Sequence, residues 1–175
     1  MEVLWLCSNQ ISSLEGLENC SNLRELWIAE NRITAVGLHL QSAARLEHLN
    51  IAGNQIADYS DVEKLSANAR LRIVSFDDCH FGKNPVVRAE GYRTFTLCYL
   101  PQVQRLDGIE ITQNDREAAR AEFTKQVLEF NNRVEQVQKD FEREFTEIDE
   151  RRHRSANHAE TFQLEMVQTF EKLQQ

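Results

Sequence analysis

The sequence predicts an α/β solenoid whose short parallel strands line a concave face, followed by a helical cap and a long α-helical segment. Three observations predict this architecture. One apolar pattern recurs four times between Met1 and Phe81, both prolines fall in the segment that follows, and the chain from Thr112 onward contains no glycine or proline. Recurrence at a fixed spacing indicates stacked repeats, and a long stretch without breakers indicates helix. The expected domains are residues 1–83 (repeats), 84–111 (cap) and 112–175 (a long helix, coiled coil or helical hairpin).

The repeated pattern is L-x-x-L-x-L-x-x-N-x-I. It begins at Met1, Leu23, Leu46 and Leu71, at intervals that match the period of a short solenoid repeat. Alternate positions at its centre are apolar, as in a strand with one buried face. The side chains expected to point inward from the first three strands are Leu4, Leu6, Leu26, Ile28, Leu49 and Ile51. No unit can bury its apolar face alone, so the units must stack.

An asparagine follows each of the first three strands, at Asn9, Asn31 and Asn54. Its amide can satisfy backbone groups that are buried at the turn. Cys79 occupies this position in the fourth unit, so we expect a looser turn there. The residues expected to fill the outer side of the solenoid are Leu14, Leu17, Val36, Leu38, Val62 and Leu65.

The segment after the fourth unit carries a second set of motifs. They are Asn84-Pro85-Val86, Tyr92-Arg93, Leu100-Pro101, and Leu106-Asp107-Gly108 followed by Ile111-Thr112. Repeats and motifs together resemble leucine-rich-repeat proteins of the short-repeat subclass with its C-terminal cap, which includes the phosphatase-one nuclear regulatory subunit and the spliceosomal A-prime protein. The resemblance extends from Met1 to Thr112. The prolines limit the cap to a helix near residues 87–97 and a strand-like segment near 103–106.

The other end of the array shows no such cap, because Met1 already occupies the first apolar position of a repeat. An open end exposes an apolar edge and unpaired strand groups. We therefore expect the chain to be part of a longer array. The alternative is a natural start whose edge is covered by a partner.

The segment from Thr112 onward predicts a helix that needs a partner. Thr112 or Asn114 can cap it, and apolar residues then recur in steps of three and four, the pattern of a coiled-coil seam. The seam consists of Val127, Phe130, Val134, Val137, Phe141, Phe145, Ile148, Phe162, Met166, Phe170 and Leu173. Arg152 and Ser155 interrupt it, so the polar interval 147–158 is the expected place for a break. The seam must be buried in a dimer, a folded-back hairpin or another protein.

The outward residues of the strands form the candidate binding face. The predicted partner-binding residues are Trp5, Trp27, Glu25, Glu30, His48, Asn50, Asp77 and Asp78. Two adjacent exposed tryptophans favour a protein-binding hot spot, and the surrounding carboxylates favour a partner with a basic or mixed-charge segment. The alternative is that a flanking part of the protein covers both tryptophans.

Composition excludes several other classes of function. A net charge of −8 and no apolar run of membrane-spanning length argue against a general nucleic-acid binder and a membrane protein. The four cysteines lie far apart without a CxxC pair, so we expect reduced thiols in an intracellular protein. No complete catalytic constellation, phosphate loop, cofactor site or metal site is expected, and His153 and His158 do not share a helix face.

These observations favour a non-catalytic scaffold or adaptor that binds proteins. The repeats with a coiled-coil extension resemble cilium-associated leucine-rich-repeat proteins, which implies a location at the cytoskeleton, cilium or basal body. The first alternative is a regulatory subunit of an enzyme such as a protein phosphatase. The second is a spliceosomal ribonucleoprotein platform in the nucleus.

Overall fold

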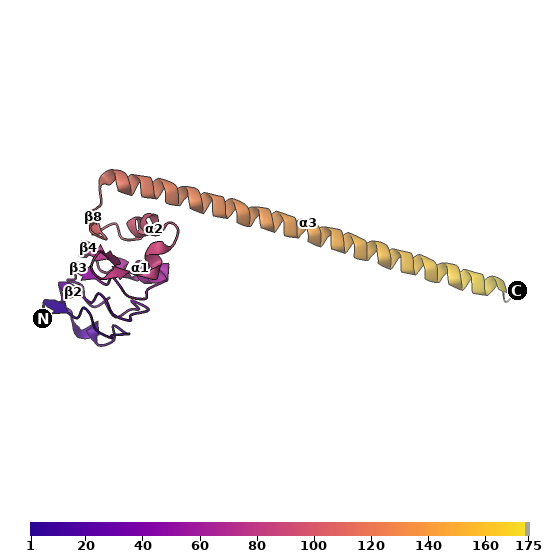
Figure 1. Cartoon of the computed structure of the whole chain (residues 1–175). Helices are drawn as coiled ribbons and strands as arrows, with labels where there is room; N and C mark the ends of the chain where they lie inside the picture. The colour runs from indigo at the N-terminus through magenta and orange to yellow at the C-terminus, as the bar shows by residue number, and fades with distance from the viewer. Residues whose placement is uncertain (174–175) are drawn as a thin grey trace. The chain divides into compact units, whose positions relative to one another are not determined.

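A computed structural model of the chain confirms the predicted solenoid and long helix (Figure 1). The structure describes the backbone of residues 1–173 and the side chains of residues 1–163 and 166. The chain divides into two compact units, residues 1–125 and residues 126–175. The first contains the repeats, the cap and the start of the last helix, and the second contains the remainder of that helix.

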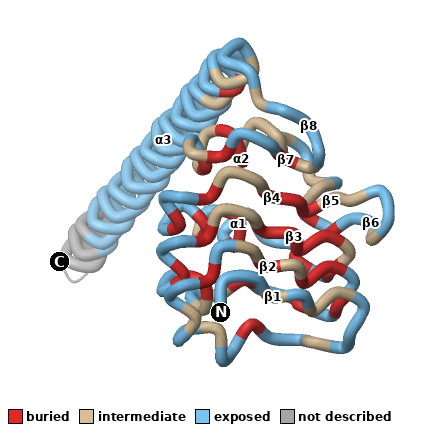
Figure 2. The backbone as a smooth tube through the Cα atoms, turned by 90° about the vertical axis from the view of Figure 1, so that its left-hand side faces the viewer, coloured by how far each residue is buried: buried red, intermediate tan, exposed pale blue. Residues whose placement is uncertain are grey.

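The repeats build one sheet of six short strands in the order β1-β2-β3-β4-β7-β8. Its parallel strands are β1 (Val3–Trp5), β2 (Glu25–Trp27), β3 (His48–Asn50), β4 (Ile73–Ser75) and β7 (Arg105–Leu106), and β8 (Ile109–Glu110) closes the sheet antiparallel to β7. Equivalent repeat positions pair with one another, so that Leu4, Leu26, Leu49 and Val74 form one inward row. Figure 2 shows the buried residues of successive turns stacked in this way.

Burial of the inward row depends on its position in the stack. Leu26, Leu49 and Val74 are fully buried, whereas Leu4 and Leu6 in the first repeat are only half-buried. The first strand has a neighbouring strand on one side only, so its inward side chains are covered by the core from that side. Val3, in the same strand, is exposed.

Asn84 takes the place of the turn asparagine in the fourth repeat, so the expectation of a looser turn at Cys79 is wrong. Asn84 is fully buried and its amide donates to the carbonyls of Ile51 and Phe76, at 2.9 and 3.0 Å. Its oxygen accepts the N–H of Ile56, in the same way that Asn54 accepts from Ile33 one repeat earlier. The side chain of Asn84 thus makes three hydrogen bonds in the fourth turn, where that of Asn54 makes four in the third.

A short hairpin displaces this asparagine along the chain. Strands β5 (Asp77–Asp78) and β6 (Gly82–Lys83) pair antiparallel and form a separate two-stranded sheet between Phe76 and Asn84. The hairpin loop lies close to the third repeat, because a Cβ added to Gly53 would lie 2.0 Å from the carbonyl oxygen of Phe81. Cys79 itself is exposed.

The outer side of the solenoid contains short helices rather than long ones. They are η1 (Leu17–Asn19), α1 (Tyr59–Lys64) and η2 (Leu65–Ala67). The predicted outer residues Leu14, Val36, Val62 and Leu65 are buried. The prediction for Leu38 is wrong, because it is 63% exposed and Leu40, two residues later, enters the core instead.

The cap forms as expected, although its helix is divided. A 3₁₀ turn, η3 (Pro85–Arg88), precedes α2 (Tyr92–Tyr99), which begins after Gly91 and ends before Pro101. The Asp107-Gly108 pair between β7 and β8 has positive φ at both residues, as a two-residue hairpin turn with a right-handed twist requires. Asp107 also accepts the N–H groups of Phe76 and Asp77, which links the cap to the fourth repeat.

The last helix, α3 (Gln113–Leu173), begins at the predicted cap. The hydroxyl of Thr112 accepts the N–H of Asp115 at 3.2 Å, and the Asp115 carboxylate accepts the N–H of Thr112 at 2.9 Å. These two reciprocal bonds satisfy donors that a helix start leaves open. Hydrogen bonds from Thr112 to the carboxylate lower the pKa of Asp115 below its ordinary value.

The first turns of α3 pack on the cap. Ala119 is buried, and the ring of Phe123 contacts the ring of Tyr99 edge-on at a centroid distance of 6.0 Å. Arg116 donates to the carbonyl of Val103. The expected domain boundary at 112 therefore coincides with the start of a helix whose first turns belong to the first compact unit.

Beyond Lys125 the helix is continuous, and the expected break in residues 147–158 is wrong. The helical hairpin that depended on this break is therefore not what the structure contains. The exposed fraction of the described seam residues ranges from 41% at Val134 to 68% at Phe141. Met166 is 54% exposed, whereas the side chains of Phe170 and Leu173 lie outside the described residues.

Candidate protein-binding face

Three aromatic side chains form a continuous cluster on the outward face of the first three strands. The rings of Trp5 and Trp27 stack at a centroid distance of 4.8 Å and an interplanar angle of 18°. The ring of His48 lies 4.3 Å from that of Trp27, tilted by 60°. Trp5 and Trp27 are direct partners in the parallel register of β1 and β2, so the repeat itself positions them. We call Trp5, Trp27 and His48 the aromatic cluster.

Exposure is unequal within the aromatic cluster. Trp5 is 67% exposed, whereas Trp27 and His48 are half-buried between their neighbours. The indole N–H of Trp27 donates to the carboxylate of Glu25 at 3.2 Å, which fixes both side chains in place. The cluster therefore presents a broad apolar surface with one carboxylate beside it.

His48 is held in its neutral form by its surroundings. Partial burial lowers its pKa below the ordinary value of 6.5, and the positive charge of Arg105 acts in the same direction. The carboxylate of Glu25 opposes both effects. At neutral pH this imidazole therefore adds a ring rather than a positive charge to the face.

The expectation that Asn50 is an open contact residue is wrong. Only 1% of its surface is exposed, and its side-chain oxygen accepts the N–H of Ala52 at 3.1 Å. Its amide donates to the carboxylate of Asp78, which comes from the β5–β6 hairpin. Ser75, the next residue in this column, is also buried. The open part of the face thus lies over the first repeats.

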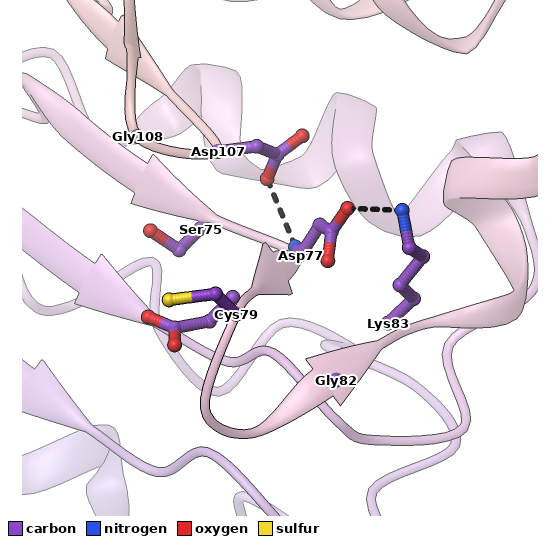
Figure 3. A pocket seen from close by; sticks show the side chains of 8 residues that line it. Ser75, Asp77, Cys79, Gly82, Lys83, Asp107 and Gly108 are labelled. Atoms are coloured by element: carbon purple, nitrogen blue, oxygen red, sulfur yellow. Dashed lines mark hydrogen bonds and ion pairs between the residues drawn. The ribbon is translucent and has the colours of Figure 1, made fainter.

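Asp77 and Asp78 lie in a different place, at a pocket beside the hairpin (Figure 3). Asp77 forms an ion pair with Lys83 at 2.7 Å, and its N–H donates to Asp107. Asp78 also accepts the N–H of His80. The pocket measures about 520 Å³ and is lined by Ser75, Asp77, Asp78, Cys79, Gly82, Lys83, Asp107 and Gly108. Both carboxylates have structural roles within the hairpin, although both remain partly exposed.

The remaining charges on the face are partly paired. Glu30 accepts the hydroxyl of Ser8 at 2.6 Å, and Arg24 pairs with Glu47 at 3.3 Å. The Arg24–Glu47 pair neutralises one carboxylate, whereas the Ser8 hydroxyl leaves the charge of Glu30 in place. The sequence interpretation also missed Arg105, which lies in β7 of the same sheet.

Arg105 continues a second outward column of the sheet. The register aligns Val3, Glu25, His48, Ile73 and Arg105. Val103 and Leu106 repeat the spacing of Leu71 and Val74, and this sequence signal could have placed Arg105 on the face. Arg105 pairs with Glu110 of β8 at 3.0 Å.

The described residues contain no group of three or more His, Cys, Asp or Glu side chains that could hold a metal ion. All four cysteines are free thiols. Within the part of the chain that the structure describes, no helix has the length and apolarity to cross a membrane. The aromatic cluster can thus offer ring surfaces and a hydrogen-bonded carboxylate, which suits binding of another chain.

Comparison with known proteins agrees with this architecture. The sequence profile described as "Leucine-rich repeat" matches residues 1–140. Dynein axonemal assembly factor 11 of Trypanosoma brucei brucei is 36% identical over 120 residues, covering 69% of this chain and 30% of that protein. Leucine-rich repeat-containing protein 23 of Bos taurus is 34% identical over 104 residues, covering 59% of this chain and 29% of that protein.

A solved structure is also similar to most of this chain. The Drosophila melanogaster SNF/U2A′ complex contains a chain that matches with a TM-score of 0.64 and 28% identity, covering 74% of each chain. This chain spans 30% and 29% of the two curated relatives above, so it corresponds to a part of each. With a profile match across residues 1–140 and parallel strands joined by an asparagine ladder, the chain belongs to the leucine-rich-repeat family.

Proposed function

We propose that this chain is a protein-interaction module of a cytoskeletal or ciliary assembly. The aromatic cluster binds a segment of a partner protein, and the helix beyond Lys125 associates with a second helix. The observation that carries the proposal is the stacked pair Trp5–Trp27 on the open part of the sheet, with Trp5 67% exposed. Tryptophan is enriched in binding hot spots because it offers a large, rigid contact area.

The chemistry of the cluster favours a particular kind of partner segment. Ring faces attract cations as well as apolar groups, and the Glu25 carboxylate lies beside Trp27. A segment that combines an apolar anchor with Arg or Lys would satisfy both features. Its binding would weaken with salt only modestly, since most of the contact area is apolar.

The ciliary assignment rests on resemblance. One relative with 36% identity is named as an axonemal dynein assembly factor, and the match covers 69% of this chain.

The test is affinity capture with quantitative mass spectrometry, comparing the natural chain with Trp5→Ala and Trp27→Ala variants. We expect a defined set of cytoskeletal or ciliary proteins to fall at least about tenfold in both variants, as loss of a hot-spot residue implies. Leu38→Ala is the matched control, because Leu38 is an equally exposed apolar residue that lies outside the sheet.

The same experiment can contradict the proposal. If both tryptophan variants capture the same proteins as the natural chain, the aromatic cluster is not the binding site. Circular dichroism of each variant provides the folding control. Capture of proteins unrelated to the cytoskeleton, lost with the tryptophans, would retain the binding face and reject the ciliary role.

A second candidate function has one specific observation in its favour. The chain resembles a chain of the SNF/U2A′ complex with a TM-score of 0.64 over 74% of its length. A nuclear ribonucleoprotein platform would capture an RNA-bound protein rather than cytoskeletal proteins. Treatment of the captured material with ribonuclease distinguishes the two, because RNA-dependent partners would disappear.

A further inference from the structure

The exposed seam residues of α3, from Val127 to Met166, form a stripe along one face of the helix. The positions in this stripe lie in pairs at equal distances before and after Ile148. Phe145 lies three residues before Ile148 and Arg151 three residues after it, and further pairs lie four, seven, eleven, fourteen and eighteen residues on either side. The pairs are Glu144 with Arg152, Phe141 with Ser155, Val137 with Ala159, Val134 with Phe162, and Phe130 with Met166. These spacings keep every member on one face of a helix. Two copies of the stripe placed antiparallel with Ile148 at the centre would therefore bring the two members of each pair opposite each other.

The side chains of several pairs complement each other in size. Phe141 and Val137 correspond to the small residues Ser155 and Ala159, while Phe162 corresponds to Val134. Large side chains opposite small ones fill an interface without voids. The three pairs farthest from Ile148 are each apolar on both sides, as the layers of a helical interface require.

Charge follows the same symmetry. Glu144 lies four residues before Ile148, and Arg152 lies four residues after it. Among the described residues neither side chain has an ion-pair partner on its own helix, although nearby Arg143 and Arg154 do. Arg152 occupies a stripe position, so it requires an anionic group opposite it when the stripe is covered.

We infer that α3 pairs with α3 of a second copy of this chain, antiparallel and centred on Ile148. In this arrangement each Glu144 faces Arg152 of the other copy, each Phe145 faces Arg151, whose aliphatic stem covers the ring, and every apolar pair described above becomes one layer. The inference rests on the proposed association of this helix and specifies its partner, orientation and register. The paired segment, residues 130–166, is about 54 Å long, or about five heptads, which is sufficient for a stable coiled coil.

A parallel, in-register pair is disfavoured by the same residues. It would place Arg152 against Arg152 and Glu144 against Glu144 within the stripe. Like charges at close range in an interface oppose association and select against that partner arrangement. It would also place Phe141 against Phe141 and leave Ser155 against Ser155, which loses the large-to-small matching.

The test is sedimentation equilibrium of the full chain at several concentrations. Glu144→Arg and Arg152→Glu should each raise the dimer dissociation constant at least about tenfold, because each creates two like-charge contacts in an antiparallel pair. The double variant Glu144→Arg, Arg152→Glu should restore association to near the natural level. The matched control is Glu150→Arg, a charge reversal on the opposite side of the helix, which should have little effect.

Each outcome decides a different point. In a parallel pair both single variants would associate as well as the natural chain, and that result would overturn the antiparallel register while retaining self-association. A natural chain that stays monomeric up to about 100 µM would overturn the pairing of two copies, while association of the helix with a different protein would still be tested by the capture experiment. Neither result bears on the aromatic cluster, whose test uses tryptophan variants. Association through the open edge of the sheet would not respond to any charge change in α3, and that result would also overturn the inference.

Discussion

Asn84 shows how much a single side chain contributes to a repeat that has lost its regular spacing. Its amide and oxygen bond to Ile51, Phe76 and Ile56, all in buried surroundings. Asn84→Ala should lower the free energy of unfolding by about 2 kcal/mol, because it leaves the buried N–H of Ile56 without a partner and removes one of the hydrogen bonds to each of the two carbonyls. Cys79→Ala should change it by less than about 0.5 kcal/mol, because Cys79 is exposed. Urea unfolding measures both values. An Asn84→Ala effect no larger than that of Cys79→Ala would show that the hydrogen bonds of Asn84 do not stabilise the turn.

His48 provides a titration that reports on the candidate face. Its folded pKa lies below 6.5 because of burial, with Glu25 opposing that shift. In an NMR pH titration its pKa should therefore lie below 6.5, and Glu25→Gln should lower it further. The unfolded chain then binds more protons in the window just below pH 6.5, so this group's contribution to stability is lost as pH falls through that window. An unchanged pKa in Glu25→Gln would show that the carboxylate does not act on this ring.

At the scale of elements, the β5–β6 hairpin depends on Gly53. This residue has a φ of +63° and no room for a Cβ, since the Phe81 carbonyl would lie 2.0 Å from it. Gly53→Ala should therefore destabilise the protein by more than the roughly 1–2 kcal/mol that left-handed backbone costs a residue with a Cβ. Gly82→Ala is the matched control, because Gly82 has a φ of +88° and no neighbouring atom within 4 Å. Equal unfolding free energies in urea would mean that the hairpin moves aside without cost.

Some of the structural elements could be predicted from the sequence, and others could not. Regular spacing predicted the strands, the inward row and the start of α3 at Thr112, because these follow from local patterns. The fourth turn was misassigned because Cys79 and Phe81 imitate the end of the pattern, while the true asparagine follows a hairpin insertion. The break near residues 147–158 was expected from the polar composition of that interval. Arg and Glu are good helix formers, however, so loss of the apolar seam did not end the helix.

The candidate binding face also has features that the sequence could predict and features that it could not. The stacking of Trp5 on Trp27 follows from equivalent repeat positions and was predictable. The burial of Asn50 was not predictable, because it depends on a contact with Asp78 from an insertion. Arg105 was missed because it lies outside the four aligned units. Long-range contacts made by irregular segments are thus the part that a repeat pattern does not contain.

For the whole molecule, the boundary of the helix and the boundary of the folded unit are different. The helix begins at Gln113, but Arg116, Ala119 and Phe123 contact the cap, and the first compact unit extends to Lys125. A chain ending at residue 125 should unfold at the same temperature as the full chain, within about 2 °C. A chain ending at residue 112 should lose about 2–4 kcal/mol, because it loses these buried contacts and the capped helix start.

Differential scanning calorimetry of the three chains at equal concentration measures this difference. A solenoid needs its ends covered, and in this molecule the first turns of α3 cover part of the cap. Equal transition temperatures for the chains ending at 112 and 125 would assign the whole helix to the second unit and make the cap self-sufficient. A low transition only in the shorter chain would mean that α3 has two roles along its length. Its first turns would stabilise the repeats, and the exposed stripe from Val127 onward would be available for association.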